Sequence, residues 1–162
     1  QIIYMIKQKI IFNLLIISLI FFLDRASKVY ILNVAESIGI VDITLSPFLN
    51  IILVWNTGIG FGLFQLDQAF AYNLITILIV IINVVIIYLL IYADKLNKFF
   101  FSMILGGSIG NLYDRIYYSA VPDFIDLNYN GYHWFVFNVA DIFITVGIFT
   151  LIFSEIFKKN EK

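Results

Sequence analysis

Four long apolar runs constrain the fold of this chain more than any other feature of its sequence. They cover residues 10–32, 69–92, 99–117 and 136–157. An α-helix of about 20 residues crosses a hydrocarbon core of about 30 Å, so each run is long enough to span a membrane. Hydrophobic residues make up 62% of the chain and charged residues 13%, which excludes an ordinary water-soluble domain. We therefore predict an all-α membrane protein: a single domain, residues 1–162, with four transmembrane helices.

The basic residues outside these runs all fall on one predicted side of the membrane. Lysines precede the first run, separate the second from the third and follow the fourth, whereas residues 33–68 and 118–135 contain neither Lys nor Arg. Short cytoplasmic segments collect Lys and Arg, so we expect both chain termini to be cytoplasmic. The longer lysine-free segment alternates β-branched and polar residues around Pro47, a pattern that favours short strands, a turn and an interfacial helix. We expect residues 33–68 to form a small extracytoplasmic cap.

Charge and residue types exclude several kinds of site. The formal net charge of -1 gives no electrostatic basis for binding nucleic acid. The chain has no cysteine, which removes thiol nucleophiles and thiolate metal sites. Its one histidine, His133, cannot build a zinc site alone. We expect neither a metal nor a cofactor.

Polar side chains from several segments gather at one depth in this topology, near the outer face of the membrane. Ionisable groups in a membrane-spanning helix are costly unless they are paired or solvated, so they indicate function. Spacings of three or four residues place Asp24 with Lys28, and Asn138 with Asp141, on single helix faces. The gathered residues are Asp24, Lys28, Asn56, Asn111, Asp114, Asp123 and Asp141.

A cluster of carboxylates without a thiol favours the chemistry of an aspartic peptidase. Two aspartates held close together share one proton, so one acts as a base and the other as an acid. The residues alone leave Asp114, Asp123, Asp126 and Asp141 as candidates for such a pair. Asp114 adjoins Arg115, which favours a permanently ionised structural carboxylate. Spacing does not separate Asp126 from Asp123.

The motifs DRASK, NTGIGF, GGSIGNLYDR, VPDF and FNVAD occur in this order, and the series closely resembles that of bacterial lipoprotein signal peptidase, also called signal peptidase II. The resemblance implies a four-helix inner-membrane aspartic endopeptidase with a small extracytoplasmic β-cradle. Such an enzyme cleaves the signal peptide from diacylglyceryl-modified prolipoproteins on the N-terminal side of the lipidated cysteine, using an activated water. The implied partners are these substrates, membrane lipid and globomycin-type cyclic peptide inhibitors.

The resemblance also assigns residues. It makes Asp123 and Asp141 the catalytic pair. The sequence departs mildly from the family pattern at Ile59, Gly60 and Gly62, where alanine or serine is common in the family. The resemblance therefore does not define the shape of the cap. The supporting or substrate-binding positions are Asp24, Lys28, Asn56, Gly58, Gly107, Asn111, Asp114, Arg115, Asn138 and Ala140.

Several of these residues, and others near them, could instead have purely structural roles. Asp24 and Lys28 could form only an intrahelical ion pair, and Asn56 could only hold a turn. GGSIG lies inside an apolar run and indicates close helix packing. Asn73 and Asn83 are expected to form interhelical hydrogen bonds. Tyr132, His133 and Trp134 are expected to act as interface anchors.

Two other classes of protein remain as alternatives. A proton-coupled small-molecule transporter would also keep acids in its helices, but it usually places them near the midplane on broken or repeated segments. This chain shows no internal repeat. A serine-lysine peptidase would need Ser27 and Lys28 to meet, whereas adjacent residues on a helix point apart.

Overall fold

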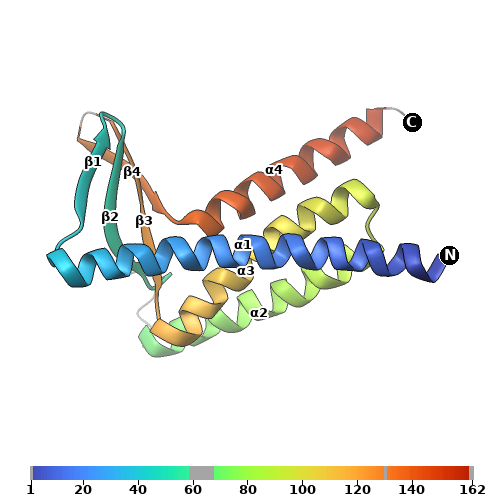
Figure 1. Ribbon diagram of the computed structural model, residues 1–162, viewed down its shortest axis with the longest axis horizontal. Coiled ribbons are helices and arrows are strands. Elements are labelled where there is room, and N and C mark those ends of the chain that lie inside the picture. The colour runs from blue at the N-terminus through green and yellow to red at the C-terminus, as the bar shows by residue number, and fades with distance from the viewer. Residues whose placement is uncertain (1, 59–67, 130, 161–162) are drawn as a thin grey trace.

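The structure is a computed structural model that describes residues 2–58, 68–129 and 131–160. Its helices run side by side, with both chain termini at one end and a four-stranded sheet near the other (Figure 1). The elements are α1 (Ile2–Ile38), β1 (Asp42–Ser46), β2 (Leu49–Asn56), α2 (Gln68–Tyr92), α3 (Lys95–Tyr118), β3 (Val121–Tyr129), β4 (Tyr132–Phe137) and α4 (Val139–Asn160).

Three helices are long and apolar enough to cross a membrane within the described residues: Ile10–Ile38, Ala69–Tyr92 and Val139–Lys158. The protein is therefore mostly helical with three candidate spans. The fourth predicted span corresponds to α3, which has 24 residues but includes Asp114 and Arg115. Because α3 contacts α1, α2 and α4, it meets protein on several sides and does not need a fully apolar sequence. The count of four spans stays a prediction.

Small residues bring α3 close to its neighbours. A Cβ on Gly106 would lie 3.0 Å from the backbone oxygen of Ile17 in α1, and one on Gly107 would lie 2.6 Å from the backbone oxygen of Ala140 in α4. Glycine at these positions allows the helix backbones to approach each other. The GGSIG segment is helical and packs as predicted.

Several helix ends differ from the ends of the predicted apolar runs, and two of these differences bear on the site or the cap. The first helix continues beyond residue 32 to Ile38, because no glycine or proline interrupts it before Gly39, where φ is 82°. The last helix begins at Val139 and not at residue 136, since Val136 and Phe137 complete β4. Asp141 is therefore in the first turn of α4.

The four strands form one antiparallel sheet in the order β1-β2-β3-β4, and α2 and α3 lie between β2 and β3 in the sequence. Only β1 and β2 come from the predicted cap, residues 33–68, so that prediction covers half of the sheet. The segment Val121–Phe137 supplies the other half as a hairpin. The predicted turn and interfacial helix fall largely on residues 59–67, which lie outside the described residues, as do Ile59, Gly60 and Gly62.

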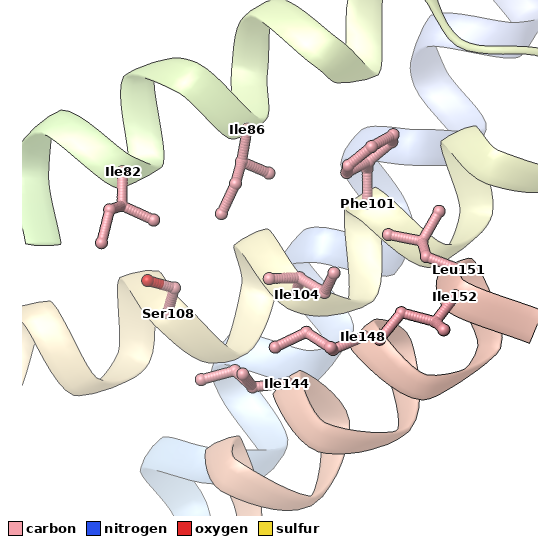
Figure 2. A pocket seen from close by; sticks show the side chains of 9 residues that line it. All are labelled: Ile82, Ile86, Phe101, Ile104, Ser108, Ile144, Ile148, Leu151 and Ile152. Atoms are coloured by element: carbon pink, nitrogen blue, oxygen red, sulfur yellow. The ribbon is translucent and has the colours of Figure 1, made fainter. Parts of the chain in front are cut away.

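The helical region holds an apolar cavity of about 360 Å³ between α2, α3 and α4. Figure 2 shows its side chains, which are isoleucines, Phe101 and Leu151 together with Ser108. This lining contains no ionisable group. Asn83 of α2 is buried, but neither of its amide atoms has a partner among the described residues, so its predicted interhelical hydrogen bond is not formed. Asn73 is exposed.

Candidate active site

Asn138 connects Asp123 and Asp141. It lies between β4 and α4, while Asp123 is in β3 and Asp141 is in the first turn of α4. Its side-chain amide donates to Oδ1 of Asp123 at 2.6 Å, and its backbone N–H donates to Oδ2 of Asp141 at 3.1 Å. The β3–β4 hairpin thus returns the chain so that the first turn of α4, which carries Asp141, lies beside Asp123.

Two further amides complete the hydrogen bonding of this pair. Asn56 of β2 donates to Oδ2 of Asp123 at 2.8 Å, and Asn111 of α3 donates to Oδ1 of Asp141 at 2.8 Å. Each of the four carboxylate oxygens therefore accepts one amide hydrogen bond. No described Lys or Arg makes a salt bridge with either carboxylate.

The surroundings of Asp123 favour its protonated form. Burial raises the pKa of Asp123 above its ordinary value, and the nearby charge of Asp141 raises this pKa further. The hydrogen bonds from Asn56 and Asn138 and the charge of Lys28 act in the opposite direction. Asp123 is 3% exposed, whereas Asp141 is half-buried. The arrangement suits a pair that holds one proton.

A buried ionic network lies beside the pair. Lys28 is fully buried and donates to Asp24 at 2.7 Å, to Asn111 at 2.8 Å and to Asp114 at 2.6 Å. Asp114 also accepts a hydrogen bond from Arg25. Two cations thus neutralise two carboxylates. Asp114 is a paired carboxylate close to cations, as expected, and these cations are Lys28 and Arg25, while the adjacent Arg115 contacts Thr57 and Tyr72.

The network is connected to the carboxylate pair at two points. The Asn111 side chain accepts from Lys28 through its oxygen and donates to Asp141 through its nitrogen. Asp24 accepts the backbone N–H of Ala140 at 2.9 Å, which fixes the start of α4 against α1. Asp24 and Lys28 form the intrahelical ion pair that their spacing predicts, and they also orient neighbouring elements.

Arg115 supports the turn that follows β2. Its guanidinium donates to the backbone oxygen of Thr57 at 3.3 Å and lies over the ring of Tyr72. Gly58 has a φ of 77°, and a Cβ there would lie 2.9 Å from Nη2 of Arg115. Asn56 accepts the N–H of Gly58 at 2.7 Å. Asn56 therefore holds the turn and also donates to Asp123.

Asp126 is separated from the pair by the geometry of β3. It is three residues beyond Asp123 in a strand, so the two side chains point to opposite faces. Asp126 is fully buried and contacts Nδ1 of His133 at 2.8 Å. Tyr132, His133 and Trp134 are exposed on β4, which suits the predicted interface anchors, but His133 has this additional partner.

Arg25 is a charged member of the ionic network that was not among the residues predicted from the sequence. It follows Asp24 in α1 and pairs with Asp114, 89 residues away. Spacing along one element could not have found it, because Arg25 meets Asp114 only through the packing of α1 against α3.

The comparisons with known proteins agree with one another. The sequence profile of the family described as signal peptidase (SPase) II matches residues 16–157. The chain is 55% identical over 150 residues to a lipoprotein signal peptidase of Pelagibacter ubique (strain HTCC1062), covering 93% of this chain and 90% of the relative. It is 41% identical over 148 residues to one of Wigglesworthia glossinidia brevipalpis, covering 88% and 92%. A solved bacterial membrane enzyme matches with a TM-score of 0.76 at 28% identity, covering 93% of this chain and 90% of that chain.

Proposed function

This chain belongs to the signal peptidase II family, and we propose that it cleaves diacylglyceryl-modified prolipoproteins with Asp123 and Asp141 as an aspartic pair. Membership of this family supports a protease that removes signal peptides from prolipoproteins. The choice of these two carboxylates rests mainly on one observation. Asn138 donates hydrogen bonds to both of them, while Asp24 and Asp114 have cationic partners and Asp126 points to the opposite face of β3.

The pair supports a general acid–base mechanism through water. Asp123, whose pKa is raised by burial, holds the shared proton at rest, and Asp141 acts as the base. Asp141 takes a proton from a water whose oxygen attacks the peptide carbonyl carbon, while Asp123 gives its proton to the carbonyl oxygen. Collapse of the tetrahedral intermediate returns a proton to Asp123. Asp141 protonates the leaving amine as the C–N bond breaks. Because water is the attacking nucleophile, no acyl-enzyme forms.

The remaining predicted positions support this pair within one domain, residues 1–162. Asn56, Asn111 and Asn138 orient the carboxylates directly. Gly107 and Ala140 bring α3 against α4. The ionic network of Asp24, Arg25, Lys28 and Asp114 holds α1 against α3, and Arg115 with Gly58 holds the turn after β2.

We place the carboxylate pair near the outer face of the inner membrane, with both termini cytoplasmic. Both termini lie at the end of the helical region away from the sheet (Figure 1). The basic residues outside the apolar runs belong to the segments at that end, which is the pattern of cytoplasmic segments. A substrate anchored by its signal helix and its acyl chains can then diffuse laterally to the pair. Globomycin-type cyclic peptides would compete with it for this site.

The proposal is tested with purified protein and a synthetic prolipoprotein in its diacylated and unmodified forms. Mass spectrometry should show release of the signal peptide immediately before the lipidated cysteine, from the diacylated form only, and a serine-directed covalent reagent should have no effect. Inactivation by that reagent would favour a Ser27–Lys28 peptidase. Proton-linked solute uptake into liposomes without peptide cleavage would favour the transporter.

A further inference from the structure

Four polar side chains gather on one face of the sheet, opposite to the face that carries Asp123. Asp126 of β3 is paired in register with Asn50 of β2, and Asn128 lies two residues further along β3. His133 of β4 is the partner of Asn128. Because cross-strand partners share a face, all four side chains point the same way.

A register irregularity in β4 brings His133 to this face. Leu127 pairs with Phe135, but Asn128 pairs with His133, so Trp134 is an extra residue in β4. In an uninterrupted register Trp134 would oppose Asn128 and His133 would point to the other face. The irregularity therefore places a hydrogen-bonding ring next to the only carboxylate on β3 besides Asp123.

Asp126 binds all three neighbours. Its Oδ2 contacts Nδ1 of His133 at 2.8 Å and accepts from the amides of Asn50 and Asn128 at 3.4 Å each. Its side chain is completely buried, whereas that of His133 is 57% exposed. A slip would leave the buried Asp126 carboxyl group without its shortest hydrogen bond, which is unfavourable, so this contact resists any slip of β4 along β3.

The contact lies in the same hairpin as the carboxylate pair. Asp123 precedes Asp126 by three residues in β3, and Asn138 follows His133 by five residues at the end of β4. The register of β3 against β4 therefore sets where Asn138 lies relative to Asp123. A slip of one residue would move the two by about 3.3 Å, which exceeds the length of the hydrogen bond between them, 2.6 Å.

We propose that Asp126 and His133 are positioning residues, which fix the register of the β3–β4 hairpin so that Asn138 can hold Asp123 and Asp141 together. This inference rests on the proposed function, because it concerns the placement of that pair. Asp126 takes no part in proton transfer. It affects cleavage only by fixing the positions of Asp123 and Asn138.

The test compares two substitutions of His133 that differ in where they place a donor. His133→Asn keeps an N–H at the position of Nδ1, whereas His133→Gln moves it to the position of Nε2. We expect kcat to fall about tenfold in His133→Gln, since small misplacements of reacting groups cost up to about 100-fold. His133→Asn should restore most of kcat, and KM for the diacylated substrate should be unchanged in both. Amounts of folded enzyme are matched by circular dichroism.

Further variants separate the possible failures. Asp126→Ala combined with His133→Ala should be no slower than the slower single variant, because both remove the same contact. Equal kcat in the Asn and Gln variants, or a change in KM alone, would overturn the inference. Abolished cleavage in Asp126→Asn, as complete as that expected for Asp123→Asn, would instead make Asp126 a proton-transfer group. Normal cleavage by Asp123→Asn would show that the proposed function itself has failed.

Discussion

Asn138 and Asp141 hold each other at the start of α4. The backbone N–H of Asn138 donates to the Asp141 carboxylate at 3.1 Å, and the backbone N–H of Asp141 donates to the Asn138 side-chain oxygen at 3.2 Å. This reciprocal pair has the form of a capping box, which satisfies two backbone donors at a helix N-terminus. It also leaves the Asn138 amide nitrogen free to donate to Asp123. One residue therefore begins a helix and joins the two proposed catalytic carboxylates.

The two tasks of Asn138 can be separated by substitution. Asn138→Ser keeps a side-chain oxygen that can cap α4 but lacks the amide that reaches Asp123, and Asn138→Ala loses both functions. We expect Asn138→Ala to lower the free energy of unfolding by about 1 kcal/mol through loss of the cap, and Asn138→Ser to lower it less. Both should lose most of kcat. Thermal unfolding and cleavage assays measure the two effects, and recovery of kcat in Asn138→Ser would contradict this division.

The raised pKa of Asp123 gives a pH prediction. As the proposed general acid, Asp123 must be protonated, so activity is present below its raised pKa and is lost as pH rises through that value. The hydrogen bond from Asn56 favours the ionised form and lowers this pKa. Asn56→Ala should therefore raise it and move the alkaline limb of the kcat profile to higher pH. Asn73→Ala, an exposed position in α2, is the control. A limb that stays in place in Asn56→Ala would count against Asp123 as the acid.

The buried cation Lys28 should dominate the stability of the helical region. Lys28→Met removes the cationic partner of Asp24 and leaves Asp114 with Arg25, and breaking a buried ion pair costs about 3–5 kcal/mol. Thermal or denaturant unfolding should show a loss of that order. Lys95→Met, at an exposed position in α3, should change the unfolding free energy little. Equal effects of the two substitutions would show that the network contributes no more than a surface lysine.

The backbone of α3 lies close to that of α4 at Gly107. A methyl group there would lie 2.6 Å from the backbone oxygen of Ala140, so the helices would have to separate. We expect Gly107→Ala to cost about 1–3 kcal/mol, as overpacking does, and to lower kcat because Ala140 lies next to Asp141. The adjacent Ser108→Ala removes only a hydroxyl and is the control. Wild-type kcat in Gly107→Ala would show that the separation of α3 and α4 does not matter for cleavage.

The fold could be predicted from the sequence where lipid imposes the constraint. The apolar runs at residues 10–32 and 69–92 identify α1 and α2, because a helix in lipid needs a long apolar stretch. The start of α4 could not be found in this way. Val136 and Phe137 are as apolar as the helix that follows, and a short apolar strand cannot be told from the start of a helix by composition.

The site was predictable to the extent that spacing along one element reveals it. Asp24 and Lys28 are four residues apart on one helix, and they form the expected ion pair. The pairing of Arg25 with Asp114 spans 89 residues and depends on how α1 packs against α3. Asp123 and Asp126 became separable only once β3 was known to be a strand, because a strand sends side chains three residues apart to opposite faces.

The most direct test of the central claim is the cleavage of a diacylated prolipoprotein by Asp123→Asn and Asp141→Asn, each compared with wild type at equal amounts of folded protein. If Asp123 acts as the acid and Asp141 as the base, each substitution alone should abolish release of the signal peptide. Thermal unfolding should still show a folded protein. Normal release by either variant would remove that carboxylate from the pair and contradict the mechanism.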